Sequence, residues 1–167
     1  MKNAASSPNR ENAVQIRLGG PADVEPLVRL INAAFRVEQP FIEGERTNAD
    51  GVRGYMEKGK FLLAEDSAGL AGCVYVELRG DRGYLGLLGV DPLRQGTGLG
   101  RKLTDSAEDY FRQAGCRAID LRIVSARMPL PAFYRHLGYV ETGTSQIPAD
   151  VPLKVPCHFI HMSKSLA

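Results

Sequence analysis

The sequence has few cysteines, and none of them form a metal-binding or disulfide pattern. Cys73, Cys116 and Cys157 are widely spaced, odd in number and without a CxxC pair. This argues against a disulfide framework and against a zinc site, so we expect no bound metal. Such cysteine usage is typical of proteins kept in a reducing compartment, and we therefore expect a cytoplasmic location.

The sequence also has little net charge and no long apolar run. The 167 residues carry a formal net charge of only +2, which gives no reason to expect nucleic-acid or anionic-membrane binding. No apolar run approaches the roughly 18 residues of a membrane-spanning helix. Residues 1–12 are polar and lack the apolar segment of a secretory signal. We interpret them as a disordered tail ahead of a single domain over residues 13–167.

Hydrophobic periodicity predicts a mixed α/β fold for that domain. Helical spacing of apolar residues covers residues 23–35, 49–58, 99–114 and 132–137. Strand patterns cover residues 14–18, 60–65, 70–78, 84–90, 118–124, 139–144 and 157–163. Turn sequences at residues 66–69 and 80–83 favour antiparallel hairpins between the central strands. The predicted order is β-α-α-β-β-β-α-β-α-β-β.

The most informative segment is a glycine-rich loop between a strand and a helix. An apolar strand over residues 85–90 leads into glycines at positions 96, 98 and 100, and a helical pattern starts at Leu99. Such a loop presents unpaired backbone N–H groups at the positive end of a helix dipole. It predicts an anion site made of backbone, suited to a phosphate or pyrophosphate.

Two nucleotide-binding patterns do not fit this loop. A P-loop requires GxxxxGK[ST], but Gly100 is followed by Arg101-Lys102-Leu103, which lacks the hydroxyl that binds magnesium. A dinucleotide-binding loop requires GxGxxG, and Arg101 stands where the third glycine is needed. The strand entering the loop also belongs to a hairpin series rather than to a βαβ unit.

A third pattern does fit. Gln95-Gly96-Thr97-Gly98-Leu99-Gly100 matches the signature (Gln/Arg)-x-x-Gly-x-(Gly/Ala), and Val90-Asp91-Pro92 precedes it. Phe133-Tyr134-x-x-Leu137-Gly138-Tyr139 follows downstream. With these motifs, residues 14–164 resemble the GNAT superfamily of acyl-CoA-dependent N-acyltransferases. The resemblance implies a mixed, mostly antiparallel central sheet of six or seven strands, splayed between the fourth and fifth strands and flanked by about four helices.

The resemblance also implies acetyl-CoA as co-substrate and assigns its binding residues. In this family the loop N–H groups hold the pyrophosphate, and the end of the fourth strand pairs with the pantetheine arm through its backbone. A backbone N–H there would polarise the thioester carbonyl. Arginines around the loop would add positive charge, and Ser125 or Arg127 replaces an asparagine that relatives often carry. The expected coenzyme-binding residues are Leu88, Gly89, Val90, Arg94, Gln95, Gly96, Thr97, Gly98, Leu99, Gly100, Arg101, Ser125 and Arg127.

For catalysis, Tyr134 matches the general acid that protonates the departing thiolate. A phenol with a pKa of about 10 stays protonated at pH 7. Many relatives carry a glutamate base on the fourth strand, but Tyr84 holds that position here, where it could anchor a chain of water. The other candidate bases are Glu38, Glu43, Glu45 and His158. The predicted catalytic set is Tyr134, Tyr84 and Glu43.

The resemblance therefore predicts direct acetyl transfer, in a ternary complex, to a primary amine of a small molecule or protein. The three glutamates within residues 36–48 favour a cationic acceptor, whereas Arg36 and Arg46 favour a carboxylate such as that of an amino acid. The missing strand glutamate leaves an alternative open, a non-catalytic acyl-CoA-binding sensor or partner module. Relatives are often dimers, so a homodimer is also open.

Overall fold

The computed structural model describes residues 13–167, so the disordered tail expected over residues 1–12 lies outside the described residues. The described chain forms one seven-stranded sheet in the order β1-β2-β3-β4-β5-β7-β6. Its strands are β1 (Gln15–Leu18), β2 (Lys60–Asp66), β3 (Gly69–Arg79), β4 (Arg82–Val90), β5 (Ala118–Val124), β6 (Val140–Gln146) and β7 (His158–Ser165). Its helices are α1 (Val24–Ala34), α2 (Ala49–Lys58), α3 (Leu99–Gln113) and α4 (Pro129–His136). The predicted order of elements and the mixed α/β class are confirmed.

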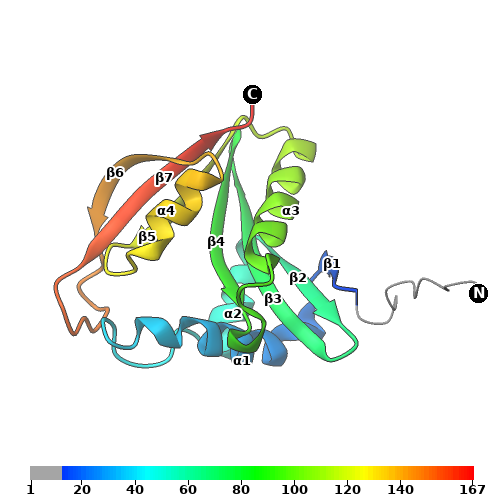
Figure 1. The fold of residues 1–167 in the computed structure, drawn as a ribbon, viewed down its shortest axis with the longest axis horizontal. Coiled ribbons are helices and arrows are strands. Elements are labelled where there is room, and N and C mark those ends of the chain that lie inside the picture. The colour runs from blue at the N-terminus through cyan, green and yellow to red at the C-terminus, as the bar shows by residue number, and fades with distance from the viewer. Residues whose placement is uncertain (1–12) are drawn as a thin grey trace, which may run out of the picture.

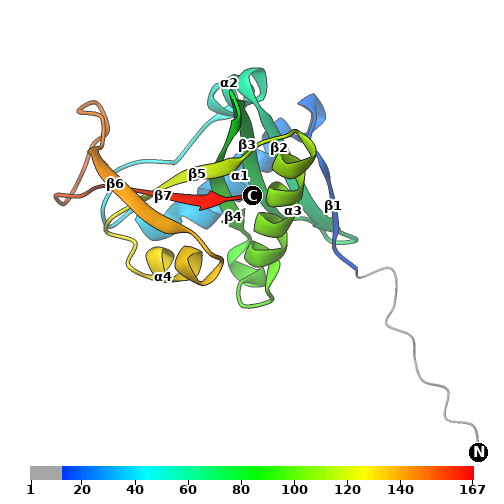
Figure 2. The same ribbon diagram turned by 90° about the horizontal axis from the view of Figure 1, so that it is seen from above.

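Helices cover both faces of the sheet. Leu62 and Val74 pack with α3 on one face, while Phe61 and Cys73 pack with α1 and α2 on the other. Successive side chains of a strand point to opposite faces of the sheet, so both sets are buried where helices cover both faces. Helix α4 joins the α3 face, and Figure 2 shows α3 and α4 on one side of the sheet with α2 on the opposite side.

Strands β4 and β5 separate after a short parallel contact. They pair only over Arg82–Tyr84 and Ala118–Asp120, and then diverge away from the end at which the C-terminus lies (Figure 1). The Arg82 guanidinium fixes the joined end by donating to both carboxylate oxygens of Asp120, at 2.7 and 2.6 Å. The splay predicted between the fourth and fifth strands is therefore confirmed.

A β-bulge interrupts β4 just beyond the point of divergence. Tyr75 pairs with Gly86 and Cys73 with Gly89, so two residues of β4 face the single residue Val74. One of the two, Leu87, has φ +46°, a conformation that costs a non-glycine residue about 1–2 kcal/mol. Bulges of this kind bend a strand and redirect its backbone next to functional sites.

Helix α4 begins three residues earlier than the sequence predicts. The expected helix covered residues 132–137 with Pro131 at its opening, whereas the observed helix starts at Pro129. Both prolines are tolerated because the N–H groups of the first helical turn have no acceptor within the helix. As a result, Tyr134 lies in the second turn of α4 rather than the first.

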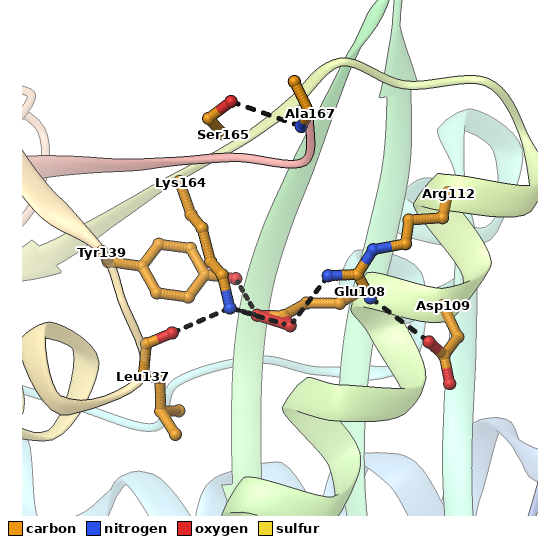
Figure 3. A network of polar contacts seen from close by, with 8 residues as sticks. All are labelled: Glu108, Asp109, Arg112, Leu137, Tyr139, Lys164, Ser165 and Ala167. Atoms are coloured by element: carbon orange, nitrogen blue, oxygen red, sulfur yellow. Dashed lines mark hydrogen bonds and ion pairs between the residues drawn. The ribbon is translucent and has the colours of Figure 1, made fainter.

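A buried ion pair connects α3, β7 and the end of α4 (Figure 3). Lys164 Nζ on β7 donates to both carboxylate oxygens of Glu108 on α3, at 2.9 and 3.1 Å, and to the carbonyl of Leu137 at 2.8 Å. The Tyr139 hydroxyl donates to the same carboxylate at 3.3 Å. Because the Glu108 side chain is only 5% exposed, Lys164 neutralises a charge that water barely reaches.

We expect Lys164→Met to lower the free energy of unfolding by about 3 kcal/mol, because it leaves the Glu108 charge buried without its main partner. Urea unfolding at pH 7 measures this loss. Adding Glu108→Gln to Lys164→Met removes the uncompensated charge and should recover about 1 kcal/mol or more. A single variant as stable as the wild type would show that the pair does not stabilise the fold.

Candidate active site

A cavity of about 400 Å³ lies where β4 and β5 diverge, a volume within the usual range of small-molecule sites. Residues 84–88 of β4 and 121–124 of β5 form two of its walls. Helix α4 contributes Leu130 and Tyr134. The segment after α1 and the loop between β6 and β7 line the rest, including Phe35, Glu38, Ile42, Glu43, Arg46, Arg127, Pro148, Pro152 and Phe159.

Tyr134 lines this cavity from α4. The residue is only 4% exposed, and its ring packs edge-on against Phe133 and Tyr139, with centroids 5.0 and 5.6 Å apart. Burial raises the pKa of the Tyr134 phenol above its ordinary value, and the charge of Arg127 opposes this only in part. The phenol therefore stays protonated across the physiological range and presents a donor to the cavity.

Glu38 is the buried carboxylate of the same cavity. It ends the short 3-10 turn Phe35–Glu38 that follows α1, and it is 6% exposed. Its backbone carbonyl accepts the N–H groups of Phe41 and Ile42, at 2.8 and 2.9 Å, which fixes the turn. Burial raises the pKa of the Glu38 carboxyl, against the opposing charges of Arg127 and Arg46. A carboxylate with a raised pKa is a better proton acceptor at neutral pH.

The other predicted proton acceptors are less enclosed. Glu43 lines the cavity only at its exposed rim. His158 is exposed and is not among the residues that line the cavity in residues 13–167. Tyr84 lines the cavity, but the Arg79 guanidinium covers its ring with Cζ 3.9 Å from the centroid. Of these side chains, Glu38 alone combines burial with access to the cavity.

The sequence interpretation missed one acidic residue near Tyr84. Glu77 on β3 pairs in register with Tyr84 and accepts a hydrogen bond from the Tyr75 hydroxyl at 2.8 Å. Burial acts to raise the pKa of Glu77, but hydrogen bonds from Arg79 and Tyr75 outweigh it and hold that pKa below its usual value. Because Glu77 already has these partners, it supports the cavity wall rather than acting within it.

The glycine loop has the conformation expected of an anion site. Gly96 and Gly98 have φ values of +80° and +79°, which side chains with a β-carbon rarely adopt. No side chain caps α3, and the first helical hydrogen bond joins the Lys102 N–H to the Gly98 carbonyl at 3.1 Å. The N–H groups ahead of Lys102 therefore point out of the helix end. A Cβ added to Gly100 would lie 3.7 Å from Phe133, so the loop is next to α4.

Several predicted coenzyme contacts have partners within the protein. Arg94 forms a bidentate ion pair with Asp66, one bond of 3.1 Å and one shorter. The Ser125 hydroxyl accepts a hydrogen bond from the backbone N–H of His158 at 3.0 Å. Arg127 lies at the cavity beside Phe35 rather than at the loop. Arg101 is exposed on the first turn of α3, next to the loop.

Neither a metal site nor a membrane helix is found among residues 13–167. No three His, Cys, Asp or Glu side chains of this range are grouped so that they could hold a metal ion. Within the same range, every helix is too short or too polar to cross a bilayer.

Comparison with known proteins identifies one family. Residues 25–139 match the model of the acetyltransferase (GNAT) family. A mycothiol acetyltransferase of Propionibacterium freudenreichii subsp. shermanii is 31% identical over 136 residues, covering 76% of this chain and 44% of the relative. One from Amycolatopsis mediterranei is 30% identical over 149 residues, covering 82% and 50%. The chain spans about half the length of these curated relatives.

Solved structures share the fold at low identity. Ard1 from Thermoplasma volcanium superposes with a TM-score of 0.78 at 16% identity, covering 93% of this chain and 99% of that one. YncA from Salmonella typhimurium, described as a putative acetyltransferase with its cofactor acetyl-CoA, gives 0.72 at 20% identity, covering 93% and 95%.

Proposed function

Because the chain belongs to the GNAT acetyltransferase family, we propose that it transfers an acetyl group from acetyl-CoA to a primary amine. The observation that carries the proposal is the pairing of Tyr134 and Glu38 in one cavity. One is a phenol kept protonated by burial, and the other is a buried carboxylate with a raised pKa. Two groups with opposite proton roles in one site are typical of acid–base catalysis.

The loop and the free edge of β4 fit acetyl-CoA. The N–H groups of residues 95–100 suit the pyrophosphate, and no β-carbon at Gly96 or Gly98 obstructs its approach. Leu88 is the second bulge residue, and Gly89 and Val90 follow it where β4 has left β5. Their backbone suits the pantetheine arm. Arg101 supplies charge near the phosphates. Arg94 shapes the loop through Asp66 instead.

In the proposed mechanism, acetyl-CoA supplies an activated acetyl carbon and a thiol leaving group. Glu38 accepts the proton that the amine nitrogen loses as its bond to the acetyl carbon forms. A backbone N–H of residues 88–90 holds the carbonyl oxygen as charge develops on it. Tyr134 donates its proton to the sulfur as the carbon–sulfur bond breaks, and solvent returns a proton to the phenolate. The products are the acetylated amine and the free thiol.

Steady-state release of the coenzyme thiol tests the proposal. Acetyl-CoA is supplied with a panel of neutral amines, amino acids, polyamines and peptides with free N-termini. We expect release that requires an amine and equals the amount of acetylated amine formed. If coenzyme A raises the melting temperature but no amine releases thiol, the chain is instead the non-catalytic coenzyme-binding module.

We expect Gly98→Ala to weaken coenzyme A binding about tenfold, because a β-carbon strains the loop conformation that aims the N–H groups. Calorimetric titration measures the affinity. Gly115→Ala is the matched control, since Gly115 has a similar φ of +83°, open surroundings and a place at the far end of α3. If both variants weaken binding equally, the loop is not part of the coenzyme-binding site.

We also propose a cytoplasmic location. All three cysteines are free thiols in the structure, as expected in a reducing compartment. A homodimer stays a prediction, and light scattering of the purified chain at several concentrations checks it.

A further inference from the structure

Two arginines converge on one aromatic ring in the cavity. The guanidinium carbons of Arg46 and Arg127 each lie 5.6 Å from the centroid of Phe35. Within residues 13–167, neither guanidinium has a carboxylate partner within 4.0 Å. An arginine over an aromatic ring keeps its N–H groups free at the edge of its plane. Arg46 is exposed at the rim of the cavity and Arg127 is half-buried, so two cations without a carboxylate partner flank Phe35.

The buried carboxylate of Glu38 faces this pair without contacting it. Both arginines influence Glu38 electrostatically, yet neither forms an ion pair with it. All three side chains line one cavity, which therefore holds one anionic group at Glu38 and two cationic groups beside Phe35. A small ligand complements this arrangement if it carries an anionic group for Arg46 and Arg127 and a cationic group for Glu38.

We propose that the acceptor is an amino-acid-like zwitterion, whose carboxylate binds Arg46 and Arg127 while its amine faces Glu38. Two guanidinium forks suit a carboxylate, which accepts bidentate hydrogen bonds. The Glu38 charge attracts the ammonium group, which loses one proton to solvent to become a free amine. Glu38 then accepts the second proton as the nitrogen–carbon bond forms, and it returns this proton to solvent after the thiol leaves. The inference rests on the proposed acetyl transfer and specifies its substrate class. Arg36, which the sequence also offered as a carboxylate ligand, is exposed and does not line the cavity.

Matched acceptors test this inference with all 167 residues of the chain and saturating acetyl-CoA. Each of several amino acids is compared with its carboxamide and with the amine that lacks the carboxyl group, by kcat/KM for thiol release. We expect the free carboxylate to be preferred about ten- to a hundredfold. Equal use of the three forms, or a preference for polyamines, would overturn the inference and leave acetyl transfer intact. No release with any amine would instead contradict the proposed function.

Variants assign the preference to particular residues. Arg46→Met and Arg127→Met should each reduce the ratio of carboxylate to carboxamide toward one, and Arg127→Lys should retain an intermediate ratio because charge remains without the fork. Arg29→Met is the control, because Arg29 is exposed on α1 and is not a cavity residue, and the ratio should stay at the wild-type value. A ratio unchanged in both methionine variants would overturn the assignment. Circular dichroism confirms folding of each variant.

Discussion

Tyr134→Phe is expected to lower kcat for acetyl transfer about 10²- to 10³-fold, the range for loss of one positioned proton donor. The phenylalanine keeps the ring that packs against Phe133 and Tyr139 and removes only the hydroxyl of this cavity-lining residue. Because the proposed coenzyme contacts lie on the loop and β4, the Kd for coenzyme A should change less than about threefold. The loss therefore falls on kcat, as expected for an interaction made only in the transition state.

Tyr139→Phe provides the matched control. Tyr139 is also buried and contacts Tyr134, but its hydroxyl donates to Glu108 rather than pointing into the cavity. Its loss should lower the free energy of unfolding by about 1 kcal/mol and leave kcat within about twofold of wild type. If both variants lose activity equally, Tyr134 acts through packing and the account of proton donation is wrong.

Glu38→Gln is expected to lower kcat/KM at neutral pH about 10²-fold, because an amide of the same shape accepts no proton. The pH profile gives the more specific signature. Burial raises the pKa of Glu38, so wild-type activity should be present above that pKa and fall as the pH drops through it, at a pH above the usual carboxyl range. This fall in activity at low pH, the acidic limb of the profile, should disappear in Glu38→Gln.

Glu43→Gln separates the two glutamates that could act as the base. Glu43 is the sequence-based candidate, but it is exposed at the rim, whereas Glu38 is buried within the cavity. We expect Glu43→Gln to change kcat/KM less than about threefold and to retain the acidic limb. If the limb disappears with Glu43→Gln and persists in Glu38→Gln, the base is Glu43.

The order of elements was predictable because it depends on local signals. Strand alternation, hairpin turns and the helical spacing after Leu99 all act within a few residues, and the glycine loop and Tyr134 lie in contiguous motifs. The predicted start of α4 was wrong by three residues because two prolines, Pro129 and Pro131, both suit a first turn.

The proton acceptor and the two arginines beside Phe35 could be identified only from the tertiary structure. The sequence offers Glu38, Glu43 and Glu45 as equivalent glutamates, and only the turn after α1 buries the first of them. The sequence predicts Arg94 as a phosphate ligand. In the fold, Asp66 comes from a distant hairpin turn and forms an ion pair with it. Arg127 lies over the ring of Phe35, a contact between residues far apart in the sequence that no local pattern encodes. Burial and long-range charge pairing depend on packing rather than on spacing along the chain.

A single-turnover experiment distinguishes direct acetyl transfer from coenzyme binding alone and from a covalent acetyl-enzyme. The protein is mixed in excess with acetyl-CoA carrying an isotopically labelled acetyl group, with and without an amine that the steady-state panel identifies. Mass spectrometry then follows the label on the amine and on the protein. For direct transfer we expect thiol release only when the amine is present, with the whole label recovered on the amine nitrogen and none on the protein. Coenzyme binding without any release of thiol, or label held covalently by the protein, would contradict it.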